Sequence, residues 1–127
     1  MQSKHFRKRD AILQCVRATN VHPSADWVFA QLKPSIPDLS LGTVYRNLAL
    51  FRQQGLITSL GTVQGVERFD GNTDPHVHFI CDNCGNVLDL ATMQMPASLT
   101  EEARTCCGGT VTGCCLTFTG RCATCKP

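Results

Sequence analysis

The sequence of 127 residues contains no apolar run that approaches the length of a membrane-spanning helix. Its first ten residues, MQSKHFRKRD, lack the apolar stretch that a secretory signal requires. We therefore expect a cytoplasmic protein without a membrane partner. The sequence also lacks internal repeats, low-complexity tracts and any pairing of a nucleophile with a base apart from candidate metal ligands. We expect a regulatory protein rather than an enzyme.

Cysteine, by contrast, is abundant, with nine residues in the chain. Disulfides are rare in a reducing compartment, so this number favours metal or redox chemistry, above all where cysteines form C-x-x-C pairs. Two such pairs are present, Cys81/Cys84 and Cys122/Cys125. Two pairs separated by a strand, a helix and a strand are typical of a closed four-thiolate site, for which Zn(II) is the favoured metal. An iron–sulfur or rubredoxin-like centre, and with it a redox enzyme, is the alternative.

Charge is unevenly distributed along the chain. Residues 1–70 carry nine Lys or Arg against five Asp or Glu, whereas residues 71–127 carry three against five. The first region is therefore compatible with nucleic acid and the second is not. An excess of this size is also common on ordinary solvated surfaces, so the charge alone decides little.

Residues 1–70 have the pattern of a winged helix-turn-helix domain. Helical spacing of apolar residues predicts amphipathic helices in RDAILQCVRA and in HPSADWVFAQL, the second capped by Ser24. Ser40 is placed to cap a third helix that ends at Gly55. LITSLGTVQGVERFD alternates apolar and polar residues around two glycines and predicts a β-hairpin. The apolar face of the third helix consists of Leu41, Val44, Leu48 and Phe51.

The other face of the third helix is polar. It includes Arg46, with Thr43 and Tyr45 at the edges of the apolar stripe. In a winged helix this element enters the major groove, so we expect Tyr45 and Arg46 to reach base edges, and Thr43 and Arg52 to hold phosphate. A protein-interaction module, in which Tyr45 only packs, is the alternative to binding double-stranded DNA.

The region after Asp70 predicts a hinge and a second domain. GNTDP, residues 71–75, combines turn-forming residues and is expected to be the hinge. Residues 76–127 then predict a small domain of mixed helix and strand. HFICDNCGNVLDL indicates two strands around a cysteine pair, PASLTEEARTCC a helix, and CCLTFTGRCATC a closing strand. The fold class of the whole chain is therefore α+β.

A second set of candidate ligands combines nitrogen and oxygen. His76 and His78 are two residues apart on one side of a strand, and Asp70 and Asp89 are near them in the sequence. Imidazole with carboxylate suits Fe(II), Mn(II) or Zn(II). His22 could join them if the two domains fold against each other, although a lone histidine before proline is usually a turn residue. A metal-dependent hydrolase is the enzyme alternative for this set.

The segments GTVYRNLALFRQQGLI, ERFD and HVHFICDNCGNVLDL resemble the recognition helix, the hinge-side ligand stretch and the H-x-H-x-x-C-x-x-C-G motif of the ferric uptake regulator family of metal-dependent bacterial repressors. The resemblance implies a homodimer bound to operator DNA, built from a winged-helix domain and a small α/β dimerisation domain. It implies a structural zinc site of Cys81, Cys84, Cys122 and Cys125. It also implies a regulatory Fe(II) or Mn(II) site of His22, Asp70, His76, His78 and Asp89.

Within that family, the sequence is most similar to the peroxide-sensing branch. Asp89 follows CGNVL where iron-sensing members usually have glutamate, and DPHVH lacks the extra histidine common in those members. This similarity implies that hydrogen peroxide causes iron-catalysed oxidation of His22 or His76 and so releases DNA. A reversible iron- or zinc-uptake repressor is the alternative within the family.

Two features depart from the family pattern. The chain begins only a few residues before the first predicted helix, so the additional N-terminal helix common in the family is expected to be reduced or absent. Five cysteines also lie outside the predicted zinc site. Packing as a small buried residue is favoured for Cys15, whereas packing, a thiol redox switch and extra metal ligation all stay open for the two vicinal pairs. These pairs are Cys106 with Cys107 and Cys114 with Cys115.

Overall fold

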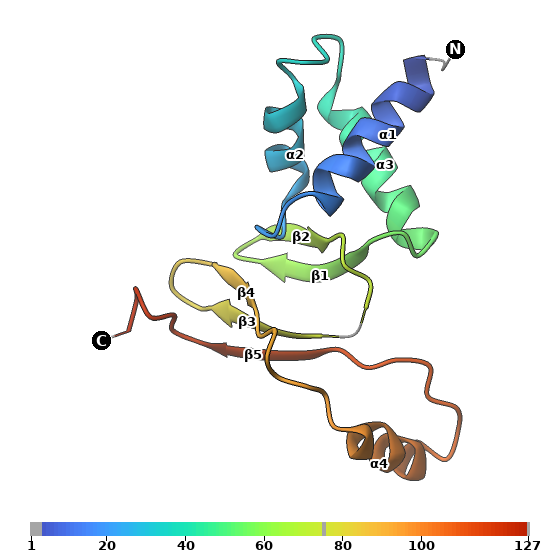
Figure 1. The fold of residues 1–127 in the computed structure, drawn as a ribbon, viewed down its shortest axis with the longest axis vertical. Helices are drawn as coiled ribbons and strands as arrows, with labels where there is room; N and C mark the ends of the chain where they lie inside the picture. Colours follow the sequence, from blue (N-terminus) through green and yellow to red (C-terminus); the bar gives the residue numbers. More distant parts are fainter. Residues whose placement is uncertain (1–3, 75, 127) are drawn as a thin grey trace. The chain divides into compact units, whose positions relative to one another are not determined.

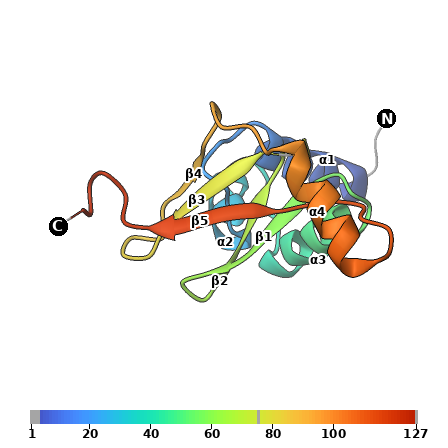
Figure 2. The same ribbon diagram turned by 90° about the horizontal axis from the view of Figure 1, so that it is seen from below.

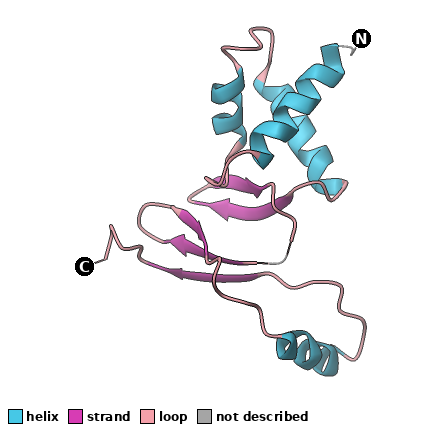
Figure 3. Cartoon of the chain, in the orientation of Figure 1, coloured by secondary structure: helices cyan, strands magenta, loops and turns pink. Residues whose placement is uncertain are grey.

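The computed structural model describes residues 4–74 and 76–126 and divides the chain into two compact units. Unit 1 is Met1–Thr73 and unit 2 is Asp74–Pro127. Figure 3 shows that helix predominates in unit 1, whereas strand and loop predominate in unit 2. Among the described residues, no helix is both long and apolar enough to cross a membrane.

Unit 1 is a winged helix, as the sequence predicts. Its second and third helices begin where serine side chains accept hydrogen bonds from the first turn, which satisfies backbone donors that the helix leaves without partners. Ser24 accepts from the amide of Trp27 and Ser40 from the amide of Thr43, both at 3.1 Å. The elements are α1 (Lys4–Arg17), α2 (Ala25–Leu32), α3 (Leu41–Gln53), β1 (Thr58–Val63) and β2 (Val66–Asp70) (Figure 1).

Strands β1 and β2 form the antiparallel hairpin expected for the wing. The two residues of its turn, Gln64 and Gly65, have φ angles of 52° and 82°. Two positive φ angles in a two-residue turn match the right-handed twist of the strands. The pairing register shifts between Ser59 and Gly61, where Gly61 has a φ of 80°. Glycine adopts that conformation at little steric cost, so the wing is bent there by a bulge.

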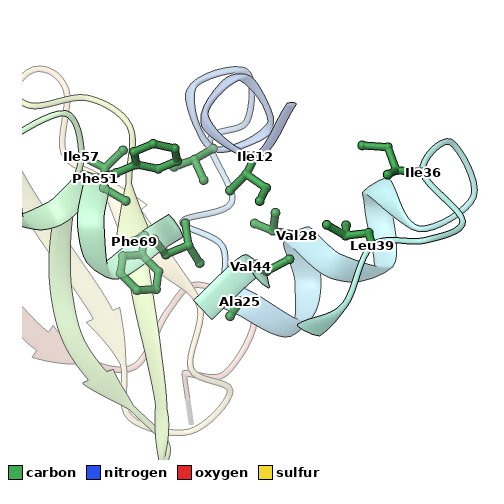
Figure 4. Close-up of a cluster of buried hydrophobic side chains, with 11 residues drawn as sticks. Ile12, Ala25, Val28, Ile36, Leu39, Val44, Phe51, Ile57 and Phe69 are labelled. Carbon is green, nitrogen blue, oxygen red and sulfur yellow. The ribbon is translucent and has the colours of Figure 1, made fainter. Parts of the chain in front are cut away.

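A single apolar cluster holds unit 1 together (Figure 4). Val44, Leu48 and Phe51 of α3 are buried in it, as predicted, but Leu41 is only half-buried. Leu41 is the first residue of α3, beside the exposed Ser40, and so lies at the margin of the core. The buried residues of the cluster are Ile12, Val16, Ala25, Val28, Ile36, Leu39, Val44, Leu48, Phe51, Ile57 and Phe69.

Unit 2 contains a three-stranded sheet in the order β4-β3-β5 (Figure 2). The pairing of β3 with β4 is antiparallel and that of β3 with β5 is parallel. A parallel pair requires a long crossover, and α4 lies in that crossover. No residue of α4 is buried. The elements are β3 (Val77–Cys81), β4 (Val87–Asp89), α4 (Ala97–Cys107) and β5 (Leu116–Gly120).

Candidate metal centres and nucleic-acid interface

The two C-x-x-C pairs converge within unit 2. Cys81 ends β3, and Cys122 and Cys125 follow β5, which runs beside β3 with Cys81 opposite Gly120. The four Sγ atoms lie within 4.8 Å of one another, and those of Cys84 and Cys122 are 3.8 Å apart. Tetrahedral Zn(II) with bonds of about 2.3 Å separates its sulfur ligands by about 3.8 Å. The spacing of the thiols therefore suits Zn(II).

Backbone amides prepare one of these thiols for metal binding. The amides of Cys84 and Cys122 donate to Sγ of Cys81 over 3.4 and 3.5 Å. These hydrogen bonds lower the pKa of Cys81 to about 6. The bond from the Cys84 amide has the larger effect. Because the thiolate is the form that binds a metal, the buried Cys81 already favours a cation at the centre of the cluster.

Unit 2 also brings together two imidazoles and one carboxylate. Nε2 of His76 and Nε2 of His78 each lie 3.2 Å from Oδ1 of Asp89. His78 and Asp89 face each other across the β3–β4 pair. Nδ1 of His76 lies 2.6 Å from the backbone carbonyl of Asp74, which can only accept, so Nδ1 carries a proton. A carbonyl bond of this kind orients a metal-binding histidine and leaves Nε2 toward the metal.

Unit 1 contributes a buried pair of the same chemistry. Nε2 of His22 lies 3.5 Å from Oδ2 of Asp70, and the two residues are 2% and 6% exposed. Oδ1 of Asp70 accepts from the amide of Asn72 at 2.9 Å, which fixes the carboxylate. His22 has a φ of 56°, a conformation that costs a residue other than glycine about 1–3 kcal/mol. His22 is therefore a buried residue held against a carboxylate, not an exposed turn residue.

The sequence motifs did not identify two residues of β2, Glu67 and Arg68, that contact candidate functional residues. Arg68 donates from Nη2 to the carbonyl of Val21 at 2.7 Å and from Nε to the carbonyl of His22. Glu67 accepts from the hydroxyl of Ser59 at 2.6 Å and from Nη1 of Arg52 at 3.2 Å. The two-residue period of a strand places Arg68 on the same face as Asp70, a signal already present in ERFD.

The predicted DNA-facing residues of α3 form a polar surface. Tyr45 is 52% exposed, and the exposed Arg46 donates from Nη2 to the hydroxyl of Thr43 at 3.1 Å. That hydroxyl is also 2.8 Å from Oγ of Ser40. The Ser40 cap thus orders the first turn of α3 and, through Thr43, the guanidinium of Arg46. Arg52, at the other end of α3, forms an exposed ion pair with Glu67 on the wing.

The remaining thiols do not form a preassembled cluster. All four vicinal cysteines are exposed, so buried packing is the wrong interpretation for them. Cys114 lines a cavity of about 310 Å³ together with Pro96 and Ala97 at the start of α4, whereas Cys107 ends α4. A helix of this length rises about 15 Å, so the two pairs lie near opposite ends of it. Cys15 is half-buried, and this burial raises its pKa.

The fold and the site define a winged-helix protein whose second domain has a four-thiol cluster suited to a metal. Residues 1–112 match the model of the Ferric uptake regulator family. The chain therefore belongs to the ferric uptake regulator family. The match ends before Cys114, so the second vicinal pair and the second C-x-x-C pair lie outside the matched region.

Known relatives agree with this membership. The peroxide-responsive repressor PerR of Staphylococcus aureus strain USA300 is 36% identical over 88 residues, which are 69% of this chain and 60% of that protein. The chain thus spans about 60% of the length of the curated relatives it matches. The structure of the Campylobacter jejuni peroxide stress regulator matches with a TM-score of 0.81 and 25% identity, over 96% of this chain and 91% of that one.

The ferric uptake regulator of Helicobacter pylori, a protein whose structure has three functional metal-binding sites, matches with a TM-score of 0.80. The match covers 98% of this chain and 85% of that one at 16% identity. At that identity the likeness shows that the fold is shared, and no more.

Proposed function

We propose that the protein is a metal-dependent transcriptional repressor that binds operator DNA as a homodimer. Membership of the ferric uptake regulator family is the observation that carries this proposal. In it, residues 1–70 are the DNA-binding domain, 71–75 the hinge and 76–127 the dimerisation domain. An edge strand and exposed apolar side chains in unit 2 support pairing, since β5 has one partner strand among the residues that the structure describes and Phe118 is 43% exposed.

The two donor sets have different roles in this proposal. Cys81, Cys84, Cys122 and Cys125 hold a structural Zn(II), which suits their four soft thiols. His22, Asp70, His76, His78 and Asp89 hold a regulatory Fe(II) or Mn(II), which suits nitrogen and oxygen donors. Unit 1 supplies two of these five donors and unit 2 supplies three. A cation that binds both sets therefore favours one arrangement of the units, by as much as its affinity differs between arrangements.

We further propose that the regulatory site senses hydrogen peroxide. His22 and His76 would help to hold an iron ion at this site, and that ion would supply the redox chemistry for reaction with hydrogen peroxide. One peroxide oxygen would be inserted into a ring C–H bond of His22 or His76, the other oxygen would leave as water, and the oxidised ring would donate more weakly to the ion. The similarity to the Staphylococcus aureus peroxide-responsive repressor supports this proposal.

Contact with DNA is assigned to α3 and its neighbours. Tyr45 and Arg46 read base edges, while Thr43 and Arg52 hold phosphate groups. The exposure of Tyr45 and Arg46 supports the first part. Because Arg52 is paired with Glu67, phosphate binding requires Arg52 to exchange or share that partner.

The proposal is tested by peptide mass spectrometry on the Fe(II)-loaded protein before and after brief exposure to hydrogen peroxide. The expected result is one added oxygen on the peptide that contains His22 or His76, and none in the Mn(II)-loaded control. Unmodified histidines at confirmed iron occupancy would contradict peroxide sensing and favour a reversible metal sensor. Oxidation confined to the exposed vicinal cysteines would favour a thiol switch.

A further inference from the structure

Three consecutive residues of strand β2, Arg68 to Asp70, contact the loop that contains His22. The guanidinium of Arg68 binds the carbonyls of Val21 and His22. The amide of Phe69 donates to the carbonyl of Pro23 at 2.9 Å. Asp70 faces the imidazole of His22 at 3.5 Å. Strand and loop are far apart in the sequence, so these contacts rather than chain continuity determine where His22 lies.

The loop that contains His22 has a positive φ angle at that residue, a conformation that residues other than glycine do not favour. His22 is one of only two residues other than glycine with a positive φ in the described parts of the chain, at 56°. It also precedes Pro23, whose ring restricts the preceding residue further. A free loop would relax toward a negative φ and turn the imidazole in another direction. Something must therefore hold the backbone at His22.

We propose that Arg68 is a positioning residue that holds the His22 turn and thereby directs the His22 imidazole toward Asp70 before the regulatory metal binds. Its two hydrogen bonds go to the carbonyls on either side of the strained residue. The bond to the carbonyl of His22 is partly buried, so water competes less for it than for the exposed carbonyl of Val21. This inference rests on the proposed function, because it assigns His22 to the regulatory site.

Arginine is specifically suited to this task. Nε and Nη2 lie in one rigid plane and can donate to two successive carbonyls at once, which a lysine ammonium on a flexible chain does less well. Partial rescue by lysine is therefore expected, because lysine keeps the charge and one hydrogen bond. Methionine keeps much of the apolar stem but donates no hydrogen bond, so Arg68→Met is the variant that removes the function of the clamp.

A double-mutant cycle separates positioning from a general structural effect. Mn(II) affinity is measured on zinc-loaded, full-length protein by the electron paramagnetic resonance signal of free Mn(II). The proteins are the original chain, Arg68→Met, His22→Ala and the double variant, with Arg68→Lys as the conservative variant. Arg104→Met is the matched control, because Arg104 lies in unit 2 and its side chain pairs with Glu101 within the same helix.

We expect Arg68→Met to weaken Mn(II) binding roughly 10- to 100-fold, the usual effect of removing a group that orients a metal ligand. The Mn(II) affinity of Arg68→Lys is expected to lie between those of the original chain and Arg68→Met. Arg104→Met is expected to bind Mn(II) as the original chain does. In the His22→Ala background, Arg68→Met should cause no further loss, because Arg68 acts through His22. An equal loss in both backgrounds, or no loss in either, would overturn the inference.

Nuclear magnetic resonance of the metal-free protein gives a readout that is independent of binding. The His22 ring should give one set of imidazole signals in the original chain and shifted or multiple signals in Arg68→Met and Arg68→Lys. Unchanged signals would overturn the clamp. Absence of a second metal in the original chain would instead overturn the proposed function, which keeps the two failures distinct. Thermal unfolding verifies that each variant is folded. If Arg68→Met does not fold, Arg68→Lys is compared with the original chain instead.

Discussion

The two units are stabilised by different means. Unit 1 buries eleven apolar side chains in one continuous cluster. In the described part of unit 2, the buried apolar residues are Val77, Cys81, Val87 and Cys122, and half of these are cysteines of the thiol cluster. Unit 1 thus resembles an ordinary small domain with its own core, whereas unit 2 has almost no core without its sulfur atoms.

This difference supports the separate roles proposed for the two sets of metal donors. The four thiols join the end of β3 to the segment after β5, so a metal there closes unit 2 on itself. Structural Zn(II) sites supply apparent binding free energies of about 10–16 kcal/mol, far more than so few buried side chains can. In the proposed function, the thiols therefore hold unit 2 together, whereas the histidine and aspartate donors, which come from both units, bind the regulatory metal.

The largest test of this comparison is removal of zinc. Chelation at low pH, or the substitution Cys81→Ser, should unfold unit 2 while unit 1 keeps its structure. Hydrogen exchange measured by mass spectrometry should show loss of protection in β3 and β5 and retained protection in α1 and α3. The amides of Leu48 and Phe51 report on α3, because both residues are buried in the core of unit 1.

Zinc content is measured on the same samples, since loss of zinc must be verified before exchange is compared. Cys15→Ser is the matched control, because Cys15 lies in unit 1 and outside the thiol cluster. Full protection of β3 after verified loss of zinc would show that unit 2 has a source of stability other than its metal.

A smaller test concerns the core of unit 1. Phe51 is fully buried, and Phe51→Ala should lower the free energy of unfolding by about 3–5 kcal/mol, through lost burial and the cavity it leaves. Leu50→Ala on the same helix is the control, because Leu50 is 40% exposed, and its effect should stay within about 0.5 kcal/mol. Urea denaturation followed by the fluorescence of Trp27, the single tryptophan of the chain, measures unit 1 alone. Similar effects of the two substitutions would contradict a dominant core at Phe51.

Features that depend on nearby residues could be predicted from the sequence. The Ser24 and Ser40 caps, the wing around Gly61 and Gly65, and the helix and strands of unit 2 follow from local spacing, and all are present. The convergence of the two C-x-x-C pairs also follows, because a crossover helix returns β5 to the side of β3. Each of these features is encoded within a few residues or in one standard connection.

Features that depend on contacts between distant segments could not be predicted. Arg68 reaches a loop 46 residues away, and Arg52 meets Glu67 only because the wing folds back on α3. The two-residue period of ERFD places Arg68 on the face of Asp70, but nothing in the sequence indicates which distant segment Arg68 or Glu67 contacts. The exposure of Cys106 and Cys107 could not be predicted either, because it depends on how little α4 packs on the sheet. The roles of the five histidine and aspartate donors are still predictions.

The smallest of the three effects concerns the helix caps, which also differ between the units. Ser40 accepts from the amide of Thr43, whereas Pro96, the N-cap residue of α4, makes no side-chain hydrogen bond. Ser40→Ala should therefore lower the stability of unit 1 by about 1 kcal/mol. Thr105→Ala in α4 removes an exposed hydroxyl that bonds within its own helix, so unit 1 should be unaffected. Urea denaturation followed by Trp27 fluorescence measures the stability of unit 1 in both variants.

Ser40 also orders the hydroxyl of Thr43. The Ser40→Ala variant should therefore bind operator DNA more weakly at equal metal loading. Unchanged DNA affinity, together with the expected loss of stability, would separate the cap from the DNA-binding surface.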